Sequence, residues 1–310
     1  MLHGFLNIDK PAGITSHDVV AQVRRLARQR RVGHAGTLDP AATGVLVVAL
    51  GAATRLIEYV QDQTIKEYRA VVRLGSATTT DDAEGEPLET RPVPALDRTA
   101  LEALLAQFHG MIEQVPPMYS ALHHEGQRLH ELARAGKTVE LAPRPVYIER
   151  ITFQEWSTPD LTIEVRCGKG TYIRALARDM GAALGCGAHL YALRRTAVGT
   201  FRIEDAVGLD TMAQWQDDTM QNSHDNVIMS SSHRVTLSHI LLPPEIAVAD
   251  WPAVTLDEAA TRRVRNGQTI VLDVVADDRV RAHGPDGALL ALLRRDGPAW
   301  KPEKVFDWTI

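Results

Sequence analysis

The sequence has few cysteines and no long hydrophobic segment. Among its 310 residues only Cys167 and Cys186 carry thiols, too few for a disulfide framework or a cysteine-rich zinc site. The longest nearly uncharged apolar run covers residues 44–53, which is far too short to cross a membrane. The start, MLHGFLNIDK, lacks the basic-then-apolar pattern of a signal peptide. We therefore expect a globular protein of the cytoplasm that does not enter a membrane.

An excess of basic residues is also missing. Lys and Arg total 34 while Asp and Glu total 39, and the net charge of −5 argues against a nucleic-acid-binding protein. The charge is nevertheless segregated. Residues 1–60 carry seven basic and four acidic groups, a balance of +3, whereas residues 204–258 carry ten acidic groups against Arg234 alone, a balance of −9. Because a field acts locally before it acts globally, a polyanion can bind one part of the molecule.

Strand-like and helix-like segments are mixed without regular βαβ alternation, which favours an α+β fold over a doubly wound sheet. Hydrophobic patterning predicts strands at residues 4–8, 44–51, 66–75, 145–156 and 161–167. Helical spacing predicts a first helix after Thr15, with Asp18 in the capping-box position, and further helices at residues 52–61, 98–110 and 171–185.

The length predicts about two domains. Residues 1–205 contain most of the predicted elements. Residues 206–250 are acidic, include the polar run QNSHDN and the triplet SSS, and are predicted to be a connection. From Trp251 to residue 310 a compact unit follows, with a helix at 256–267 and a β-hairpin around the turn GPDG.

Asp39 is the most suggestive candidate for chemistry. It lies in the glycine-rich loop GHAGTLDPAATG, between small residues and before Pro40. Proline restricts the residue before it to extended geometry, and the glycines allow a substrate to approach the backbone closely. An isolated Asp-Pro pair more often forms only a turn. On these residues alone both interpretations stay open.

A second cluster, CGKGTYIRALARD, spans residues 167–179 at a predicted strand-to-helix junction. Such a junction binds anions through free amides and the helix dipole, so Lys169 could contact a phosphate while Tyr172 and Arg174 project from the first turn. The alternative is an ordinary loop with a solvated lysine. The segment lacks the upstream glycine of a Walker motif.

Two further groups of residues allow a functional and a structural interpretation. The histidines in HHEGQRLH do not form an HExxH arrangement and no second ligand group is evident, so we expect no metal. Five arginines between Arg24 and Arg31 either form a solvated helix face or, being near the Asp39 loop in sequence, contact a polyanion.

Six motifs occur together and in order: KPAGITSHDVV, GHAGTLDPAATGVL, KEYRAVVRLG, QVPPMYSALHHEGQRLHELARAGKTVE, GKGTYIRALARDMG and AHLYALRRTAVG. In this combination the sequence resembles the bacterial tRNA pseudouridine-55 synthase family, closely over residues 1–200 and loosely beyond. The resemblance implies a catalytic domain at residues 1–205 with a mixed, largely antiparallel sheet and flanking helices. It also implies that residues 251–310 form a small PUA-like, β-rich RNA-binding domain.

The resemblance further implies a reaction and its residues. Uridine in the T-loop of tRNA would be isomerised to pseudouridine without cofactor or metal, by a monomer that needs no protein partner. By match to the family motifs, Asp39 would be the catalytic carboxylate and Arg174 its partner, with Lys10 in support. The substrate would be bound by His34, Tyr68, Tyr172 and Leu193.

The chemistry agrees with these roles, because remaking a glycosidic bond needs a nucleophile or an anion beside the sugar, and a base in a folded loop must be flipped into an apolar pocket. Three positions depart from the family pattern, His123, Leu141 and Thr79, and they bear on RNA contacts more than on catalysis. Two alternatives stay open: a synthase for another RNA, working with a guide RNA and protein partners, and a non-catalytic tRNA-folding chaperone.

Overall fold

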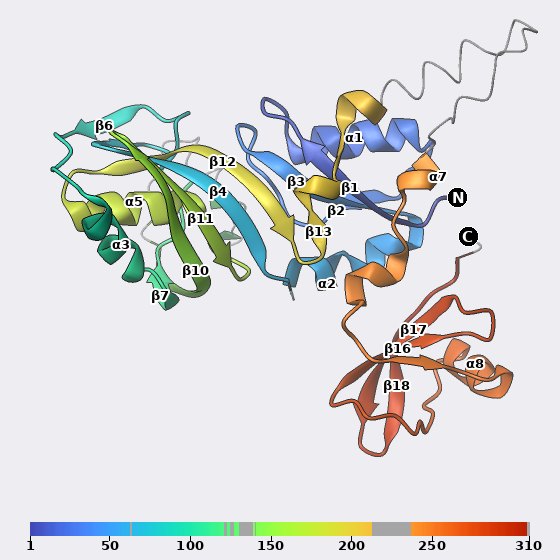
Figure 1. Cartoon of the computed structure of the whole chain (residues 1–310). Helices are drawn as coiled ribbons and strands as arrows, with labels where there is room; N and C mark the ends of the chain where they lie inside the picture. The colour runs from blue at the N-terminus through green and yellow to red at the C-terminus, as the bar shows by residue number, and fades with distance from the viewer. Residues whose placement is uncertain are drawn as a thin grey trace, which may run out of the picture.

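The computed structural model describes residues 1–62, 64–120, 123–124, 127–129, 139, 141–212 and 237–308. Its main element is a mixed, mostly antiparallel sheet of ten strands (Figure 1). Along the sheet the order is β14 (Val207–Gly208), β1 (Gly4–Lys10), β3 (Thr43–Leu50), β12 (Ala188–Val198), β4 (Lys66–Leu74), β11 (Asp160–Cys167), β10 (Arg144–Ser157) and β7 (Gly110–Gln114), with β2 (Val32–His34) on β3 and β13 (Phe201–Arg202) on β12. The predicted α+β class is confirmed.

Strand β12 joins the two halves of this sheet. It pairs with β4 in antiparallel fashion along its length, but it pairs with β3 in parallel only at Arg194–Thr43 and Arg195–Gly44. The close approach requires a glycine, because Gly44 has φ +100° and a Cβ there would lie 2.2 Å from the Arg195 carbonyl oxygen. The Asp39 loop precedes Thr43, so it lies at the junction of the halves.

The half-sheet of β1 and β3 is buried on both faces, which explains its nearly continuous apolar sequence. On one face of this half-sheet, even-numbered residues such as Leu6 and Leu46 pack against α1 (Ser16–Leu26). On the other face, odd-numbered residues such as Phe5 and Val45 pack against η1 (Gly51–Leu56) and α2 (Ile57–Asp62). The predicted Thr15–Asp18 capping box at the start of α1 is confirmed.

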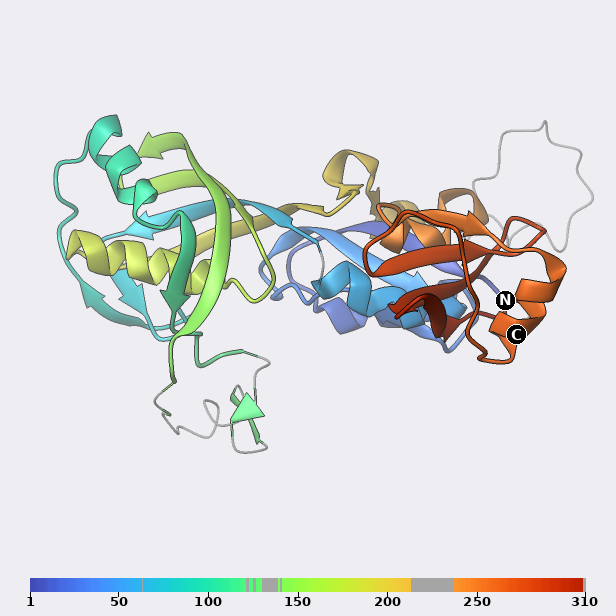
Figure 2. The same ribbon diagram turned by 90° about the horizontal axis from the view of Figure 1, so that it is seen from below.

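The other half-sheet packs on two helices, α3 (Arg98–Ala106) and α5 (Ile173–Leu184). Gly185 ends α5 with φ +73°, as its position after the last periodic residue predicted. Figure 2 shows these helices at the end of the molecule away from the C-terminal unit. The short strands β5 (Ser76–Thr78) and β6 (Pro87–Thr90) form a separate ribbon, as do β8 (His123–His124) and β9 (Gln127–Arg128).

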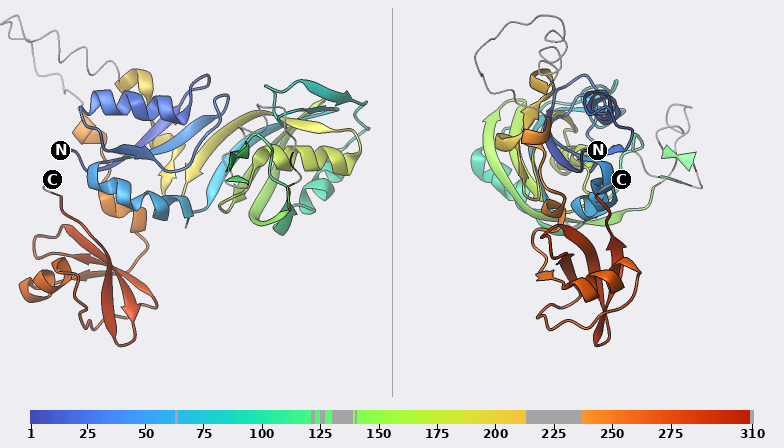
Figure 3. Two further views of the ribbon diagram at one scale, coloured as in Figure 1. Left: turned by 180° about the vertical axis from the view of Figure 1, so that it is seen from behind. Right: turned by 90° about the vertical axis from the view of Figure 1, so that its right-hand side faces the viewer.

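The C-terminal unit is a four-stranded sheet with one helix, and the predicted helix and hairpin are both present. Its elements are β15 (Ala253–Thr255), α8 (Glu258–Arg265), β16 (Arg279–His283), β17 (Leu289–Asp296) and β18 (Ala299–Val305). It packs against α2 (Figure 1). The ring of Tyr59 on α2 lies edge-on to that of Trp251, with 5.2 Å between centroids, and its hydroxyl donates to Glu303 Oε1 at 2.9 Å. Near the chain ends, His3 packs edge-on against Trp308. The N and C labels accordingly lie close together in both views of Figure 3.

The predicted connection at residues 206–250 is described in part. β14 pairs with β1, and the Phe5–Leu242 bridge ties the segment between α7 (Leu237–Ile240) and η3 (Pro244–Val248) to the same strand. The motifs QNSHDN and SSS lie outside the described residues. The remaining short elements are β13 and η2 (Ile203–Asp205). Within the described part of the chain, no helix has the length and apolar character to span a bilayer.

Candidate active site

The loop that contains Asp39 connects β2 to β3 and is tied to the first motif of the chain. The Leu38 N–H donates to Ser16 Oγ over 2.9 Å, and Ser16 Oγ donates to the Leu38 carbonyl over 3.1 Å. Ser16 is buried at the start of α1. Two residues after Leu38, the Pro40 carbonyl accepts from the Gly13 N–H at 2.9 Å. Bonds on either side of Asp39 therefore fix the backbone that presents its carboxylate.

Lys10 supports the same loop from the end of β1. Its side chain is completely buried, and the ammonium group donates to three carbonyls: Pro11 and Ile14 at 2.8 Å each, and Pro40 at 3.1 Å. Burial lowers the pKa of Lys10, and the Asp39 carboxylate opposes that effect. The lysine thus links the turn after β1 to the residue that follows Asp39.

Arg174 reaches the Asp39 carboxylate from the first turn of α5, in the other half of the sheet. Its Nε lies 3.1 Å from Asp39 Oδ2. The arginine side chain is only 8% exposed, whereas the aspartate side chain is 43% exposed. The cation is therefore enclosed by protein while the carboxylate stays open to a substrate.

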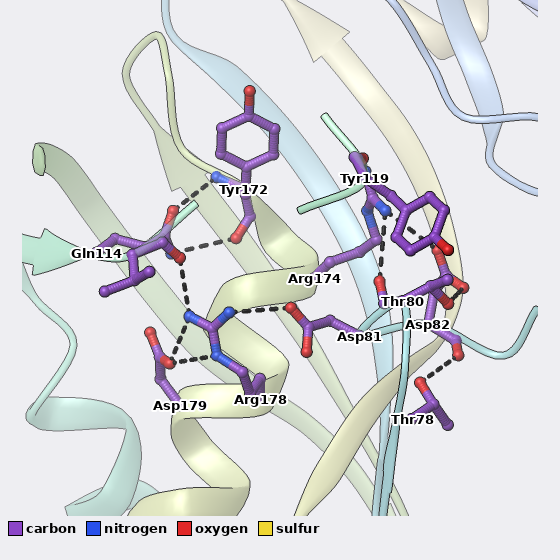
Figure 4. A network of polar contacts seen from close by, with 11 residues as sticks. Thr78, Thr80, Asp81, Asp82, Gln114, Tyr119, Tyr172, Arg174, Arg178 and Asp179 are labelled. Carbon is purple, nitrogen blue, oxygen red and sulfur yellow. Dashed lines mark hydrogen bonds and ion pairs between the residues drawn. The ribbon is translucent and has the colours of Figure 1, made fainter. Parts of the chain in front are cut away.

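The other two guanidinium nitrogens of Arg174 contact the segment after β5 and the backbone of Tyr119 (Figure 4). Nη1 lies 3.4 Å from Asp82 Oδ2 and donates to the Thr80 carbonyl at 3.4 Å, and Nη2 donates to the Tyr119 carbonyl at 2.7 Å. Two carboxylates thus share one guanidinium, with Asp82 on the enclosed side. The orientation of Arg174 is set independently of any substrate.

One turn further along α5, Arg178 forms a second network in Figure 4. Its Nη1 contacts Asp81 Oδ2 at 2.9 Å, its Nε donates to Asp179 Oδ1 at 3.0 Å, and its Nη2 donates to the Val115 carbonyl at 2.8 Å. Asp81 has φ +60°, so its backbone is left-handed at the point where it meets Arg178. This network fastens the segment that carries Asp82 to α5.

The environment of Asp39 alters its acidity in two opposing ways. Burial raises the pKa of the Asp39 carboxyl, and the Arg174 guanidinium acts in the other direction. Asp82 adds a smaller upward effect and Lys10 a smaller downward one. The net result is a pKa above the ordinary aspartate value, so that this carboxylate is more basic than an exposed one.

Two tyrosines lie near Asp39. Tyr68 is buried on β4, and burial raises the pKa of its phenol. Tyr172 is the N-cap of α5, where its N–H donates to Gln114 Oε1 at 2.9 Å and its carbonyl accepts from the Gln114 amide at 3.2 Å. Burial raises the pKa of Tyr172 too, and the Asp39 charge adds a small upward effect on the pKa of both phenols.

Leu193 and His34 complete the predicted set. Leu193 is half-buried on β12, opposite Ala70 of β4 and next to the Asp39 loop through its carbonyl, which accepts from Thr43 Oγ1 at 3.5 Å. His34 ends β2 and packs edge-on against His17 at 5.4 Å. Burial lowers the pKa of His34, and its Nδ1 has no hydrogen-bond partner within the described part of the chain.

Other predicted contacts lie apart from Asp39 or outside the described residues. Lys169 is exposed and faces Asp62 at 3.6 Å, as the solvated-lysine interpretation has it. Thr79 is exposed and bonded to the backbone of Glu86, and Leu141 is half-buried in the loop before β10. Much of the HHEGQRLH segment, and the side chain of His123, are not described. No cluster of metal-ligating side chains occurs among the residues that are described.

The sequence did not single out three residues that the structure brings to the Asp39 loop or to its arginine. Ser16 holds Leu38, Asp82 holds Arg174, and Arg195 donates to the carbonyls of Gly36 and Thr37. Ser16 and Arg195 lie inside two of the six motifs, and Asp82 lies three residues after Thr79, which departs from the family pattern. Their places in the sequence were therefore the signal that could have found them. Their contacts depend on the pairing of distant strands, which no local pattern encodes.

Fold and site together present one accessible carboxylate, held by an enclosed arginine at the junction of the two half-sheets. Three family models cover most of the chain. The TruB family pseudouridylate synthase N-terminal domain matches residues 24–173, the tRNA pseudouridylate synthase B C-terminal domain matches residues 174–249, and the tRNA pseudouridine synthase II C-terminal domain matches residues 251–307.

Similar proteins agree with these models. The chain is 45% identical to tRNA pseudouridine synthase B of Thermobifida fusca over 99% of both chains, and 43% identical to that of Cupriavidus metallidurans over 98% of this chain and 94% of the relative. Among solved structures, a chain of a Cbf5–Nop10–Gar1 complex is 27% identical with a TM-score of 0.71, covering 98% of this chain and 85% of its own. The protein belongs to the TruB family of pseudouridylate synthases.

Proposed function

We propose that the protein isomerises the uridine at position 55, in the T-loop of tRNA, to pseudouridine, with Asp39 as the catalytic carboxylate. The observation that supports this most directly is the Asp39–Arg174 pair, in which an open carboxylate lies 3.1 Å from an enclosed guanidinium. The relatives named tRNA pseudouridine synthase B align with nearly the whole chain. Substrate and product contain the same atoms, so the reaction needs no oxidant and no group donor.

The reaction breaks the bond between N1 of uracil and C1′ of ribose and forms a bond between C5 and C1′. The proton on C5 is lost and N1 gains one. An ionised Asp39 assists either by bonding to the nucleoside or by balancing positive charge on the sugar. Arg174 keeps the carboxylate ionised and fixed while the glycosidic bond is broken.

The residues around Asp39 suit a flipped base. A uridine in a folded loop must leave its stack before a carboxylate can reach C1′, and an apolar, aromatic pocket compensates for the lost stacking. Tyr68 and Leu193 supply the faces of that pocket, and Tyr172 borders it from α5. We assign to Tyr68 the stacking on uracil and a part in removing the C5 proton. His34 lies beside the flipped nucleotides, at the end of β2.

The RNA backbone would contact a basic surface on a protein that is acidic as a whole. Arg24, Arg25, Arg28, Arg30 and Arg31 are exposed at the end of α1 and just after it, and none forms an ion pair with another described residue. RNA loops are recognised by shape and by such backbone contacts together with splayed bases. The PUA-like unit at residues 251–310 would add to binding but not to the chemistry.

The two alternatives make different demands on partners. Structural relatives at 26–27% identity come from multi-component complexes, one of them an H/ACA RNP bound to a substrate RNA. The relatives at 41–47% identity are named as tRNA enzymes, which favours a protein that acts on tRNA. We propose that it does so as a monomer and without a guide RNA. A tRNA-folding chaperone would not need the Asp39–Arg174 pair. We place the reaction in the cytoplasm.

The test is to incubate the purified protein alone with a tRNA transcript made without modifications, and to map pseudouridine along the RNA. We expect pseudouridine at position 55 only. A transcript with cytidine at that position, and the Asp39→Asn protein, are the controls and should both give none. Pseudouridine elsewhere would point to another RNA site, and binding without any pseudouridine would favour the chaperone.

A further inference from the structure

Arg195 is a buried cation without a carboxylate partner in the described structure. Its side chain is among the largest that are fully buried, at 1% exposure. Nε donates to the Val45 carbonyl at 2.7 Å, Nη2 to the Gly36 carbonyl at 3.1 Å and Nη1 to the Thr37 carbonyl at 3.4 Å. No described acidic side chain forms an ion pair with it. Neutral carbonyls therefore provide most of its solvation.

Such an arrangement is costly, because a buried charge normally requires a counterion. Basic groups nearby increase the free-energy cost of burying this charge. Arg195 adds to the effects that lower the pKa values of Lys10, Lys66 and His34, so several basic groups surround it. An apolar side chain of similar size would avoid this cost. The guanidinium must therefore do something at this place that an apolar group would not do.

The geometry connects Arg195 to both candidate catalytic groups. Thr37 and Gly36 lie two and three residues before Asp39, so Arg195 holds the start of the segment that presents the carboxylate. On the other side, Arg195 lies directly opposite Tyr68 in the pairing of β12 with β4, and both side chains are buried. Arg195 thus contacts the loop and is the cross-strand neighbour of the tyrosine.

A guanidinium has N–H donors and no acceptor, so Arg195 can stabilise the phenol oxygen of Tyr68 but cannot take up the phenol proton. Burial raises the pKa of Tyr68, and the Arg195 charge opposes it. Cys167 on β11 and Asp39 also face the phenol, and both raise that pKa further. Among these groups Arg195 alone favours the phenolate.

We propose that Arg195 is a positioning residue for the isomerisation, which fixes the Asp39 loop and favours the phenolate form of Tyr68, because only a phenolate that has already released its own proton to solvent can take the C5 proton of the uracil. The proposal rests on the proposed function, since it assigns a role within that reaction. Arg194, its neighbour in sequence, has a different role, because it pairs with Asp9 at 2.8 Å and is 41% exposed.

The test combines kinetics with a direct measurement on the phenol. Arg195→Met and Arg195→Lys are compared with the wild type in single-turnover pseudouridine formation, each also in a Tyr68→Phe background. Arg73→Met is the matched control, because Arg73 lies on the same strand as Tyr68 but pairs with Asp160 at 2.7 Å. Thermal unfolding shows that each variant is folded, and Arg195→Lys retains a charge if Arg195→Met does not fold.

We expect Arg195→Met to slow the single-turnover rate by about 100-fold with little change in tRNA binding. Arg195→Lys should recover part of the rate, because a point charge does not reproduce the planar fork. In the Tyr68→Phe background the same changes should cost less, since part of their effect acts through the missing hydroxyl. Normal rates in folded Arg195→Met, or equal losses in both backgrounds, would overturn the proposal.

The second measurement does not depend on turnover. Fluorotyrosine is placed at position 68 of the full chain and titrated by fluorine NMR. Its ionisation should occur at higher pH in Arg195→Met than in the protein with Arg195, and should be unchanged by Arg73→Met. An identical titration with and without Arg195 would refute this effect on Tyr68. If wild-type protein forms no pseudouridine, the proposed function fails, and this titration still decides whether Arg195 acts on Tyr68.

Discussion

Arg174 Nε and Asp39 Oδ2 lie 3.1 Å apart, and the two side chains differ in access to solvent, 8% against 43%. The arginine comes from α5 and the aspartate from the loop before β3, so the contact closes the junction between the two halves of the sheet. Arg174 is anchored by Asp82 and by backbone carbonyls. The carboxylate can therefore meet a substrate without losing its counterion.

The first prediction concerns the charge on Asp39. Asp39→Asn keeps the shape of the side chain and removes the anion, so it should lower the single-turnover rate by about 10⁴-fold or more. Binding of tRNA should stay nearly normal, because Ser16, Lys10 and Arg195 hold the loop through backbone atoms. Rapid-quench kinetics and filter binding measure the two effects. Near-normal rates would remove Asp39 from the mechanism.

The second prediction concerns the acidity of Asp39. The reaction requires the ionised carboxylate, so the rate should fall as the pH drops through the raised pKa of Asp39, above the ordinary value of about 3.9. Arg174→Ala removes the main effect that lowers this pKa. The acidic limb of the pH–rate profile should then move upward by about one to three pH units, and the rate at neutral pH should fall by about 10²–10³-fold.

Two variants make that experiment specific. Arg174→Lys should shift the acidic limb less than Arg174→Ala and restore the rate only in part, because lysine lacks the planar fork. Arg178→Lys, one turn along α5, should leave the limb in place, since Arg178 contacts Asp81 and Asp179 instead of Asp39. An acidic limb at the same pH in the wild type and in Arg174→Ala would mean that another group titrates.

Much of the fold was accessible from the sequence because its long elements have strong periodic patterns. β4, β10 and β11 were predicted almost to their ends, and so was α5 with Gly185. The short strands could not be predicted in this way. The glycine-rich pattern of residues 33–44 predicts a loop throughout, yet β2 includes Gly33 and His34, because they pair with Ala49 and Val48 of β3. Two or three residues carry no periodic signal, and only their partners define them.

The same distinction applies to the candidate site: motifs identify some of its residues, and strand pairing determines the rest. Residue types and spacing alone pointed to Asp39 and Arg174, with a structural interpretation of each still open, whereas Tyr68 and the catalytic roles came only through resemblance to a family. Arg194 and Arg195 show what the sequence could not supply. They are adjacent arginines of one strand, and the sheet register decides that Arg195 is enclosed against Tyr68 while Arg194 is partly exposed beside Asp9.

The third prediction concerns Lys10. Lys10→Met keeps a similar volume but leaves the carbonyls of Pro11, Ile14 and Pro40 without their common donor. Carbonyls left without a donor should reduce the free energy of unfolding by about 2 kcal/mol. Chemical denaturation measures the loss. Lys169→Met is the control, because its exposed ion pair with Asp62 should contribute less than about 0.5 kcal/mol. Equal stabilities of the two variants would contradict a structural role for Lys10.

The last prediction concerns the arginines at the end of α1. Ser16 at the start of the helix is bonded to Leu38, so Arg24 and Arg25 in its last turn lie roughly 12–14 Å further along the helix axis, at about 1.5 Å per residue. Arg28 and Arg30 follow just beyond the end of the helix. A tRNA arm bound at Asp39 can reach them. Arg24 donates to the Val32 carbonyl at 2.9 Å and is left unchanged, whereas Arg25, Arg28 and Arg30 are exposed.

Replacing Arg25, Arg28 and Arg30 together by Gln should weaken tRNA binding and make it less sensitive to salt. Removing one arginine–phosphate interaction should reduce the slope of log affinity against log salt by about 0.7–0.9, so the slope should fall by about 2–3 if all three arginines bind phosphate. A control triple with the same change in charge is available away from α1: Arg91 after β6, Arg98 at the start of α3 and Arg150 on β10, which are all exposed. Titrations at several salt concentrations compare the two. An unchanged slope in the first triple would exclude the α1 surface as the RNA-binding surface, and an equal fall in both would mean that only net charge matters.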